Sequence, residues 1–199
     1  MKAKKIFNSI AWIYDLTDAN IRKSFKPSIR ALSREIDLRE KSVLDVGTGT
    51  GVWADMVREY GAVVSGIDVS DKMLAKAIKR YGRDISFMEA DASDLTHLEN
   101  DSFDIVTASF VLHGMTRDKR EPVLLEMRRV SRGIIAIHDY DKGAPLFSLF
   151  LEWLEKSDYY NFTEHFLEEF RDFFNDCTKV TVGKGTALYI GRKPLAATI

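Results

Sequence analysis

Residues 43–51 read Val43-Leu44-Asp45-Val46-Gly47-Thr48-Gly49-Thr50-Gly51, an apolar strand that runs into a glycine-rich turn. Glycines in such a turn let the backbone approach a ligand closely, and the N-terminus of the following helix faces the same place. In open α/β sheets, ligands of nucleotide type bind at the carboxyl ends of the strands. The stretch therefore predicts an α/β fold with a cofactor site at the end of its first strand.

Short β-branched runs alternate with amphipathic segments along most of the remaining chain, which is typical of this fold class. We expect strands at 42–46, 62–67, 85–89, 103–109 and 133–138, each covered on both faces, and helices at 52–60, 72–81 and 121–130. Ser70 is the expected N-cap of the second helix, and Pro122 suits the first turn of the third. Runs at 179–182 and 187–190 around two glycines predict a closing antiparallel hairpin.

The composition excludes several classes of protein. A chain of 199 residues with 45% hydrophobic residues has the material for one packed domain. Its formal net charge of -1 lacks the positive field of a nucleic-acid binder, so we expect no nucleic-acid partner. The single cysteine, Cys177, forms neither an internal disulfide nor a zinc site with other cysteines, which favours a cytoplasmic location. We find no apolar run long enough to span a membrane and no signal for an oligomeric state.

Within one domain over residues 1–199 we distinguish four parts. Residues 1–40 form a helical N-terminal cover, 41–140 the cofactor-binding core, 141–176 an aromatic lid with a final helix, and 177–193 the hairpin. The first part is basic and the third acidic, so we expect their charges to help them meet. A phenylalanine stripe at helical spacing predicts a core-facing side of the final helix; it comprises Phe162, Phe166, Phe170, Phe173 and Phe174.

The ends of three successive strands carry carboxylates, at Asp45, Asp68 and Asp91, and none carries Lys or Arg. A pyrophosphate would be repelled there, and the sixth position of the dinucleotide fingerprint, counted from Gly47, is Val52 instead of glycine. Asp68 follows Gly47 by 21 residues, where an acidic side chain accepts both ribose hydroxyls. The pattern suits a cationic nucleoside without phosphates, and S-adenosylmethionine is such a ligand.

Four motifs in order resemble those of class I S-adenosylmethionine-dependent methyltransferases. They are Leu44 to Gly51, Gly66-Ile67-Asp68-Val69-Ser70 with Met73-Leu74, Glu89-Ala90-Asp91-Ala92, and Phe103-Asp104-Ile105-Val106. The resemblance implies a doubly wound, mostly parallel seven-stranded sheet with a C-terminal antiparallel hairpin, the Rossmann-like methyltransferase fold. The stretches Ile6-Phe7-Asn8-Ser9-Ile10-Ala11-Trp12-Ile13-Tyr14-Asp15-Leu16 and Gly185 to Lys193 further resemble small relatives of the ubiquinone/menaquinone-biosynthesis methyltransferases.

The same resemblance implies roles for individual residues. Asp45 and the turn around Gly47 and Gly49 hold the methionine end of the cofactor, Asp68 holds the ribose diol, and the adenine lies near Asp91. The complete expected cofactor set is Tyr14, Asp45, Gly47, Thr48, Gly49, Gly51, Asp68, Val69, Met73, Asp91, Ala92 and Ser109. Structural alternatives remain open, because Asp45 and Asp91 also suit turn capping and Met73 also suits a helix core.

Three polar residues are expected beside the methyl group: His113, His138 and Asp139. His113 is the candidate catalytic base, although a hydrogen bond to a loop carbonyl is the alternative role for it. The candidate substrate residues are His138, Tyr140, Phe147 and Trp153, and the expected aromatic lid comprises Tyr14, Phe147, Phe150, Trp153, Tyr159 and Tyr160. These aromatic residues suit a small, partly apolar acceptor.

The fourth strand ends in Thr107-Ala108-Ser109-Phe110. Enzymes that methylate nucleobase amines have an Asn/Asp-Pro-Pro-Tyr/Phe motif there, so its absence argues against such substrates. We therefore predict a methyltransferase that acts on a small molecule. Two alternatives remain, a non-catalytic S-adenosylmethionine-binding protein and an NAD(P)-dependent oxidoreductase.

Overall fold

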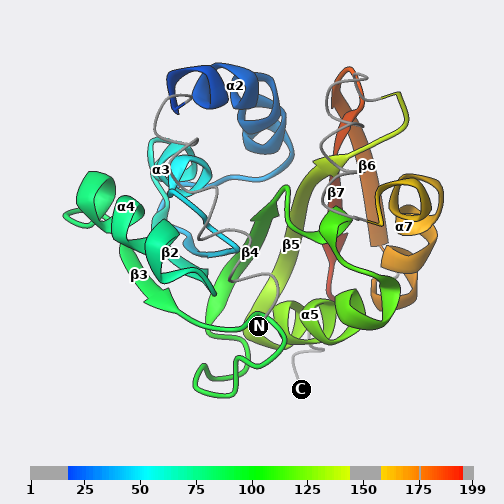
Figure 1. Ribbon diagram of the computed structural model, residues 1–199. Coiled ribbons are helices and arrows are strands. Elements are labelled where there is room, and N and C mark those ends of the chain that lie inside the picture. Colours follow the sequence, from blue (N-terminus) through cyan, green and yellow to red (C-terminus); the bar gives the residue numbers. More distant parts are fainter. Residues whose placement is uncertain (1–17, 144–157, 175, 195–199) are drawn as a thin grey trace.

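A seven-stranded sheet in the order β3-β2-β1-β4-β5-β7-β6 organises the protein (Figure 1). We describe it from a computed structural model for residues 18–143, 158–174 and 176–194. The strands are β1 (Ser42–Val46), β2 (Val63–Asp68), β3 (Ser86–Glu89), β4 (Phe103–Ser109), β5 (Ser131–Tyr140), β6 (Asp176–Gly183) and β7 (Thr186–Arg192). The first five are parallel, and β7 pairs antiparallel with both β5 and β6. The expected sheet and its closing hairpin are confirmed.

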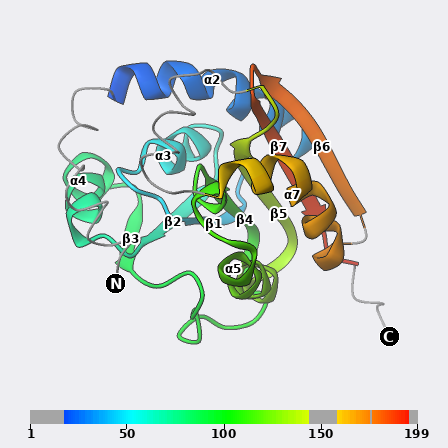
Figure 2. The same ribbon diagram turned by 45° about the vertical axis from the view of Figure 1, so that its right-hand side comes forward.

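Helices cover both faces of this sheet. They are α2 (Asp18–Glu35), α3 (Val52–Arg58), α4 (Asp71–Tyr81), the short 3-10 helix η1 (Leu112–Gly114), α5 (Arg117–Val130) and α7 (Tyr159–Phe173). Figures 1 and 2 show α2, α3 and α4 on one side of the sheet and α5 and α7 on the other. None of the helices in the described ranges is long and apolar enough to cross a membrane.

Alternation along the buried strands divides the core into two layers. Leu44 and Val46 of β1 pack with α5 and α7, whereas Val43 of the same strand packs with α2 and α3. Because successive side chains of a strand point to opposite faces, a continuously apolar strand serves both layers at once. The third expected strand differs, since β3 lies at the sheet edge and leaves Met88 41% exposed.

The sequence predicted two features of the helix starts; one is confirmed and the other is wrong. Ser70 caps α4 as expected, since its hydroxyl accepts a hydrogen bond from the Met73 amide at 3.2 Å. Helix α5, however, begins at Arg117 behind Thr116, so Pro122 lies at its sixth residue and not in its first turn. The polar stretch before Pro122 carries no apolar periodicity, and for that reason the sequence pattern missed the first helical turn.

In the described parts of the basic and acidic segments, the ion pairs run to other neighbours. Arg22 of α2 forms ion pairs with Asp55, at 2.7 Å, and with Glu59, both of which belong to α3. Acidic residues of α7 instead find partners in nearby elements: Glu164 pairs with Lys142 at 2.8 Å. Arg22 therefore connects α2 to α3, which lies on the same side of the sheet.

Helix α7 is a core helix anchored by a buried ion pair. The buried phenylalanines are Phe162, Phe166 and Phe170 of α7 and Phe174 directly after it, whereas Phe173 is half-buried. This burial confirms the core-facing stripe. Arg120 of α5 is fully buried and donates to both carboxylate oxygens of Glu169, at 3.0 and 2.9 Å. It also donates to Asp158 at 3.1 Å and to the carbonyl of Met115, so one guanidinium joins α5, α7 and the loop after β4.

Candidate active site

The glycine-rich turn leads from β1 into α3 at the carboxyl edge of the sheet. Gly47 has a φ of +66°, and a Cβ added there would lie 2.6 Å from the Cγ2 atom of Val111. Gly51 has a φ of +83° and is the N-cap of α3. Because L side chains rarely adopt this left-handed backbone region, both positions require glycine. The turn therefore keeps its backbone, rather than side chains, next to the strand ends.

Asp45 is fully buried at the end of β1. The Thr107 hydroxyl of the neighbouring β4 donates to Asp45 Oδ1 at 3.0 Å, whereas Asp45 Oδ2 has no hydrogen-bond partner within the described ranges. Burial raises the pKa of Asp45 to about 7. The nearby hydroxyls of Thr48 and Thr107 lower this pKa, and the charge of Asp68 raises it further. A buried carboxylate oxygen without a donor is costly, so the geometry favours a cationic ligand beside Asp45.

Asp68, at the end of β2, lies against the glycine-rich turn. Its Oδ2 accepts the Gly49 amide at 2.9 Å and its Oδ1 accepts the Ser70 amide at 2.8 Å. Burial raises the pKa of Asp68, although these backbone donors lower it. Each oxygen keeps a lone pair beyond its amide bond, so a bidentate contact to a diol remains chemically possible. In the part of the chain that the structure describes, neither Asp68 nor Asp45 forms an ion pair.

The predicted adenine-side residues lie in different environments. Asp91 is exposed beyond β3, and its Oδ1 accepts both the amide and the hydroxyl of Ser93, at 3.0 and 2.7 Å. Met73 is buried in α4, and Val69 and Ala92 are half-buried near the same edge. The structure thus shows a turn-capping contact for Asp91 and core burial for Met73, and the roles of these residues toward adenine stay predictions.

His138, near the end of β5, is a buried neutral histidine. Ser28 Oγ of α2 lies 2.9 Å from its Nε2, and Ser109 Oγ of β4 lies 3.0 Å from its Nδ1. Burial lowers the pKa of His138 to about 4, outweighing the opposite effect of the Asp139 charge. Its ring stacks on Trp53 with centroids 4.9 Å apart. Both ring nitrogens are therefore engaged, and His138 connects α2 to the end of β4.

His113 lies in η1, directly after β4, and pairs with a buried carboxylate. Its Nδ1 is 2.6 Å from Asp139 Oδ1, so one of its partners is a carboxylate side chain. The rings of Phe110 and Tyr140 lie edge-on to the imidazole, with centroids at 6.2 and 4.7 Å. The structure thus brings three predicted residues together, His113, Asp139 and Tyr140.

Phe110 marks this loop as locally strained. Its φ of +54° is unusual for a bulky residue, and such strain is common at functional sites. The Phe110 amide donates to the His138 carbonyl at 2.8 Å, which holds this residue against β5. Sequence patterns did not single out Phe110 or Trp53 as site residues, because no pattern signals a left-handed phenylalanine or a stacking contact across the sheet.

Several residues of the predicted site and lid are not part of the arrangement around His113 and His138. Tyr14, Phe147, Phe150 and Trp153 lie outside the described residues. Tyr159 is buried against Tyr140, with ring centroids 5.2 Å apart, whereas Tyr160 is 72% exposed. No group of His, Cys, Asp and Glu in the described ranges is arranged to hold a metal ion.

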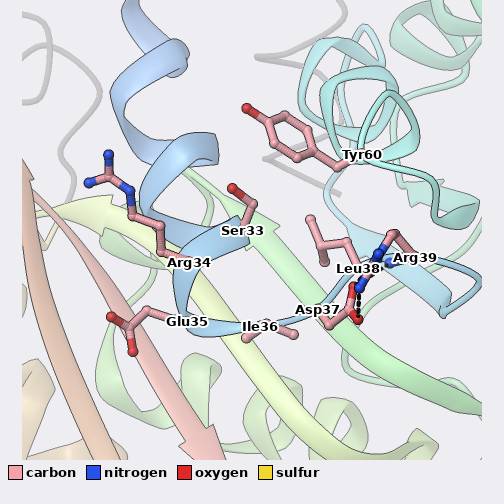
Figure 3. Close-up of a pocket in the computed structure, with 8 residues that line it drawn as sticks. All are labelled: Ser33, Arg34, Glu35, Ile36, Asp37, Leu38, Arg39 and Tyr60. Atoms are coloured by element: carbon pink, nitrogen blue, oxygen red, sulfur yellow. Dashed lines mark hydrogen bonds and ion pairs between the residues drawn. The ribbon is translucent and has the colours of Figure 1, made fainter.

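A pocket of about 440 Å³ lies away from the glycine-rich turn (Figure 3). It is formed where α2 ends and the chain enters β1, at the amino end of the sheet. Residues 33–39 and Tyr60 line it, and Asp37 and Arg39 pair with each other there at 2.8 Å. This pocket contains none of the predicted site residues, which lie around the carboxyl ends of the strands.

Comparison with known proteins finds similar sequences over the middle of the chain. Residues 43–133, from β1 into β5, match the family model of a methyltransferase domain. Demethylmenaquinone methyltransferase of Thermus thermophilus is 38% identical over 114 residues, 53% of this chain and 50% of that enzyme. Ubiquinone biosynthesis O-methyltransferase of Thiobacillus denitrificans is 34% identical over 87 residues, 42% of this chain and 38% of that enzyme. The chain thus matches half or less of the length of these curated relatives.

A solved structure extends the likeness to nearly the whole chain. Magnesium protoporphyrin IX methyltransferase of Synechocystis PCC 6803, solved with bound S-adenosylhomocysteine, superposes with a TM-score of 0.69 at 18% identity. The superposition covers 96% of this chain and 98% of that one. Similarity to a methyltransferase domain thus covers residues 43–133, and the fold shared with a solved methyltransferase covers nearly the whole chain.

Proposed function

We propose that this protein transfers a methyl group from S-adenosylmethionine to a small, partly apolar acceptor. The observation that carries the proposal is the pair of carboxylates at the ends of β1 and β2. Asp45 has a buried oxygen without a donor, and Asp68 lies against the glycine-rich turn. S-adenosylmethionine would supply an ammonium group, a ribose diol and a sulfonium that carries the transferable methyl group.

The residues present fit this cofactor. We assign the ammonium to Asp45 Oδ2, because a cation there would satisfy the orphaned oxygen. We assign the ribose diol to Asp68 and the backbone contacts to the turn from Gly47 to Gly51. The pyrophosphate of a dinucleotide would instead face two carboxylates, which is repulsive. The similar structure of magnesium protoporphyrin IX methyltransferase, which holds S-adenosylhomocysteine, supports this cofactor class.

The acceptor site is assigned to the ends of β4 and β5. Phe110 and Tyr140 supply apolar ring surface there, with centroids 4.9 Å apart, and His113 lies edge-on to both. Flat apolar walls with a few polar groups are typical of small-molecule sites. Because both nitrogens of His138 are bound to serine hydroxyls, we assign His138 a supporting role behind this wall.

Cofactor binding is expected to weaken in acid because of Asp45. With a pKa of about 7, Asp45 in the ligand-free protein is protonated below that pH, and a neutral carboxyl attracts the ammonium less. Each pH unit below the pKa reduces the population of the ionised form about tenfold. Titration calorimetry should therefore show S-adenosylhomocysteine binding about 30-fold more weakly at pH 5.5 than at pH 8.

Two controls isolate the carboxylate in this experiment. 5'-Methylthioadenosine lacks the ammonium, so its affinity should change little over the same pH range. The Asp45→Asn variant cannot ionise, so its affinity for S-adenosylhomocysteine should be low and independent of pH. A wild-type affinity that stays constant from pH 8 to pH 5.5 would refute the assignment of the ammonium to Asp45.

A further inference from the structure

The solvent-facing side of α2 carries positive charge only. Four exposed cations occupy this side, and residues 19–34 of the helix contain neither Asp nor Glu. The four are Lys23, Lys26, Arg30 and Arg34. At about 100° of rotation per residue, they fall within an arc of about 80°. They therefore form one row along the helix, which we call the α2 stripe.

The cations of the α2 stripe form no ion pair in the part of the chain that the structure describes. Arg22, on another side of the same helix, is by contrast paired with Asp55 at 2.7 Å. The nearest acidic residue in the sequence is Glu35, directly after Arg34. Figure 3 shows the carboxylate of Glu35 and the guanidinium of Arg34 pointing in different directions. The charge of the α2 stripe is thus open to solvent.

Repulsion within the α2 stripe opposes the formation of the helix. Successive members are about 4.5 to 6 Å apart along the axis, less than the screening length of about 8 Å in physiological salt. Like charges at this spacing destabilise a helix. The exposed faces of α5 and α7 instead mix both signs, and Arg117 of α5 pairs with Asp172 of α7 at 3.0 Å. Folding therefore gives no reason for a row of one sign, whereas binding to an anionic partner does.

The helix that carries the α2 stripe also packs over the assigned acceptor site. On its inner side, the Phe25 ring stacks on Phe110 with centroids 5.8 Å apart. Ser28 Oγ lies 2.9 Å from His138 Nε2, at the end of β5. The first two cations of the stripe flank Phe25 in the sequence. A surface bound to the stripe therefore lies close to the acceptor site.

An anionic membrane surface matches the α2 stripe in charge and shape. Anionic headgroups present negative charge over a flat area, which a straight row of cations contacts with all its members at once. Surfaces that bind single-stranded nucleic acid combine cations with exposed aromatic rings that stack on the bases. The exposed residues between the four cations are Ser24 and Pro27, which supply no such ring. These features favour lipid headgroups as the partner.

We propose that the α2 stripe docks this protein on membranes that contain anionic phospholipids. The ammonium and guanidinium groups contact the phosphates of the headgroups, and each cation adds to a binding energy that salt weakens. Docking brings the acceptor site next to the bilayer, where apolar molecules concentrate. This last consequence rests on the proposed function, whereas the docking itself does not.

The first test is sedimentation with vesicles of phosphatidylcholine alone and of phosphatidylcholine mixed with phosphatidylglycerol. Wild-type protein should bind only the mixed vesicles in about 0.1 M salt and should dissociate in about 1 M salt. The triple variant Lys26→Gln, Arg30→Gln, Arg34→Gln should bind them about 100-fold more weakly, or about fivefold for each cation. Urea denaturation should show this variant at least as stable as wild type, because the substitutions remove repulsion.

A matched variant separates the α2 stripe from the total charge. Lys72→Gln, Lys79→Gln and Arg83→Gln together remove three exposed cations from α4 and the turn after it, so they change the net charge equally. This variant should bind the mixed vesicles as wild type does. Equal losses of affinity in the two triple variants would overturn the assignment to α2.

The second test maps the contact on the wild-type protein. Acetylation by a water-soluble reagent, followed by mass spectrometry, measures how accessible each lysine is. Mixed vesicles should slow the acetylation of Lys23 and Lys26 and leave that of Lys72 and Lys79 unchanged, since only the first two lie in the α2 stripe. Protection of the α4 lysines without protection of the α2 lysines would show that another surface meets the membrane.

Both tests are independent of methyl transfer, because neither cofactor nor acceptor is present. Wild-type protein that ignores the mixed vesicles, or that binds phosphatidylcholine equally well, would overturn the proposal. A labelled DNA duplex and a labelled RNA strand are measured in the same buffer, and tighter binding to either would assign the α2 stripe to nucleic acid instead. Failure to bind S-adenosylhomocysteine would refute the proposed function and leave the membrane docking standing.

Discussion

Replacing Arg120 with methionine is expected to lower the free energy of unfolding by about 3 to 5 kcal/mol, the range for breaking a buried ion pair. The substitution leaves Glu169 buried without its partner and removes donors from Asp158 and the Met115 carbonyl. Urea denaturation followed by circular dichroism measures the change. The loop after Met115 should also loosen, because the same guanidinium holds it to α7.

Two further variants show whether the buried charge is the cause. Arg120→Met combined with Glu169→Leu removes both charges and should recover most of the lost stability, because an apolar pair replaces a buried ion pair at little cost. Arg117→Met breaks the exposed pair with Asp172, at 3.0 Å, and should cost less than about 1 kcal/mol. Equal losses from Arg120→Met and Arg117→Met would contradict the role of Arg120 as the anchor of α7.

Asp68→Ala is expected to weaken S-adenosylhomocysteine binding by about 1.5 to 3 kcal/mol, the range for hydrogen bonds to a charged group. This corresponds to an increase in Kd of about 10-fold to 150-fold. The physical reason is the loss of the carboxylate that we assign to the ribose diol, together with its bond to the Gly49 amide in the turn. Titration calorimetry on the purified variant gives the affinity directly.

The controls for Asp68 separate binding from folding. Asp84→Ala removes an exposed carboxylate at the end of the loop before β3 and should leave the affinity unchanged. Circular dichroism and denaturation should show that Asp68→Ala remains folded, since the side chain is only partly buried. A folded Asp68→Ala protein with wild-type affinity would assign Asp68 a purely structural role in the turn.

Local sequence patterns predicted the features that depend on residues close together in the chain. The strand before Gly47 and the glycine-rich turn from Gly47 to Gly51 follow from a buried strand that leads into a helix. The Ser70 cap and the phenylalanine stripe of α7 follow likewise from capping preference and helical spacing. The resemblance to a family implied a seven-stranded, mostly parallel sheet. The order of its strands comes from the structure, because no local pattern states which strands pair.

The remaining features arise from contacts between distant parts of the chain. His113 and Asp139 are 26 residues apart, and only the pairing of β4 with β5 places them within 2.6 Å. Arg120 and Glu169, 49 residues apart, meet because α5 and α7 pack side by side. The left-handed backbone of Phe110 also depends on the neighbouring strand, whose His138 carbonyl holds its amide. Such pairings cannot be derived from spacing alone.

We infer that the carboxyl ends of the strands in this sheet bind S-adenosylmethionine rather than a dinucleotide. Titration calorimetry at pH 8 with S-adenosylhomocysteine and with NAD+, each added to the unmodified protein, distinguishes the two ligands. We expect saturable binding of S-adenosylhomocysteine and no measurable binding of NAD+, because Asp45 and Asp68 attract an ammonium and repel a pyrophosphate. Binding of NAD+ with comparable or higher affinity would contradict it.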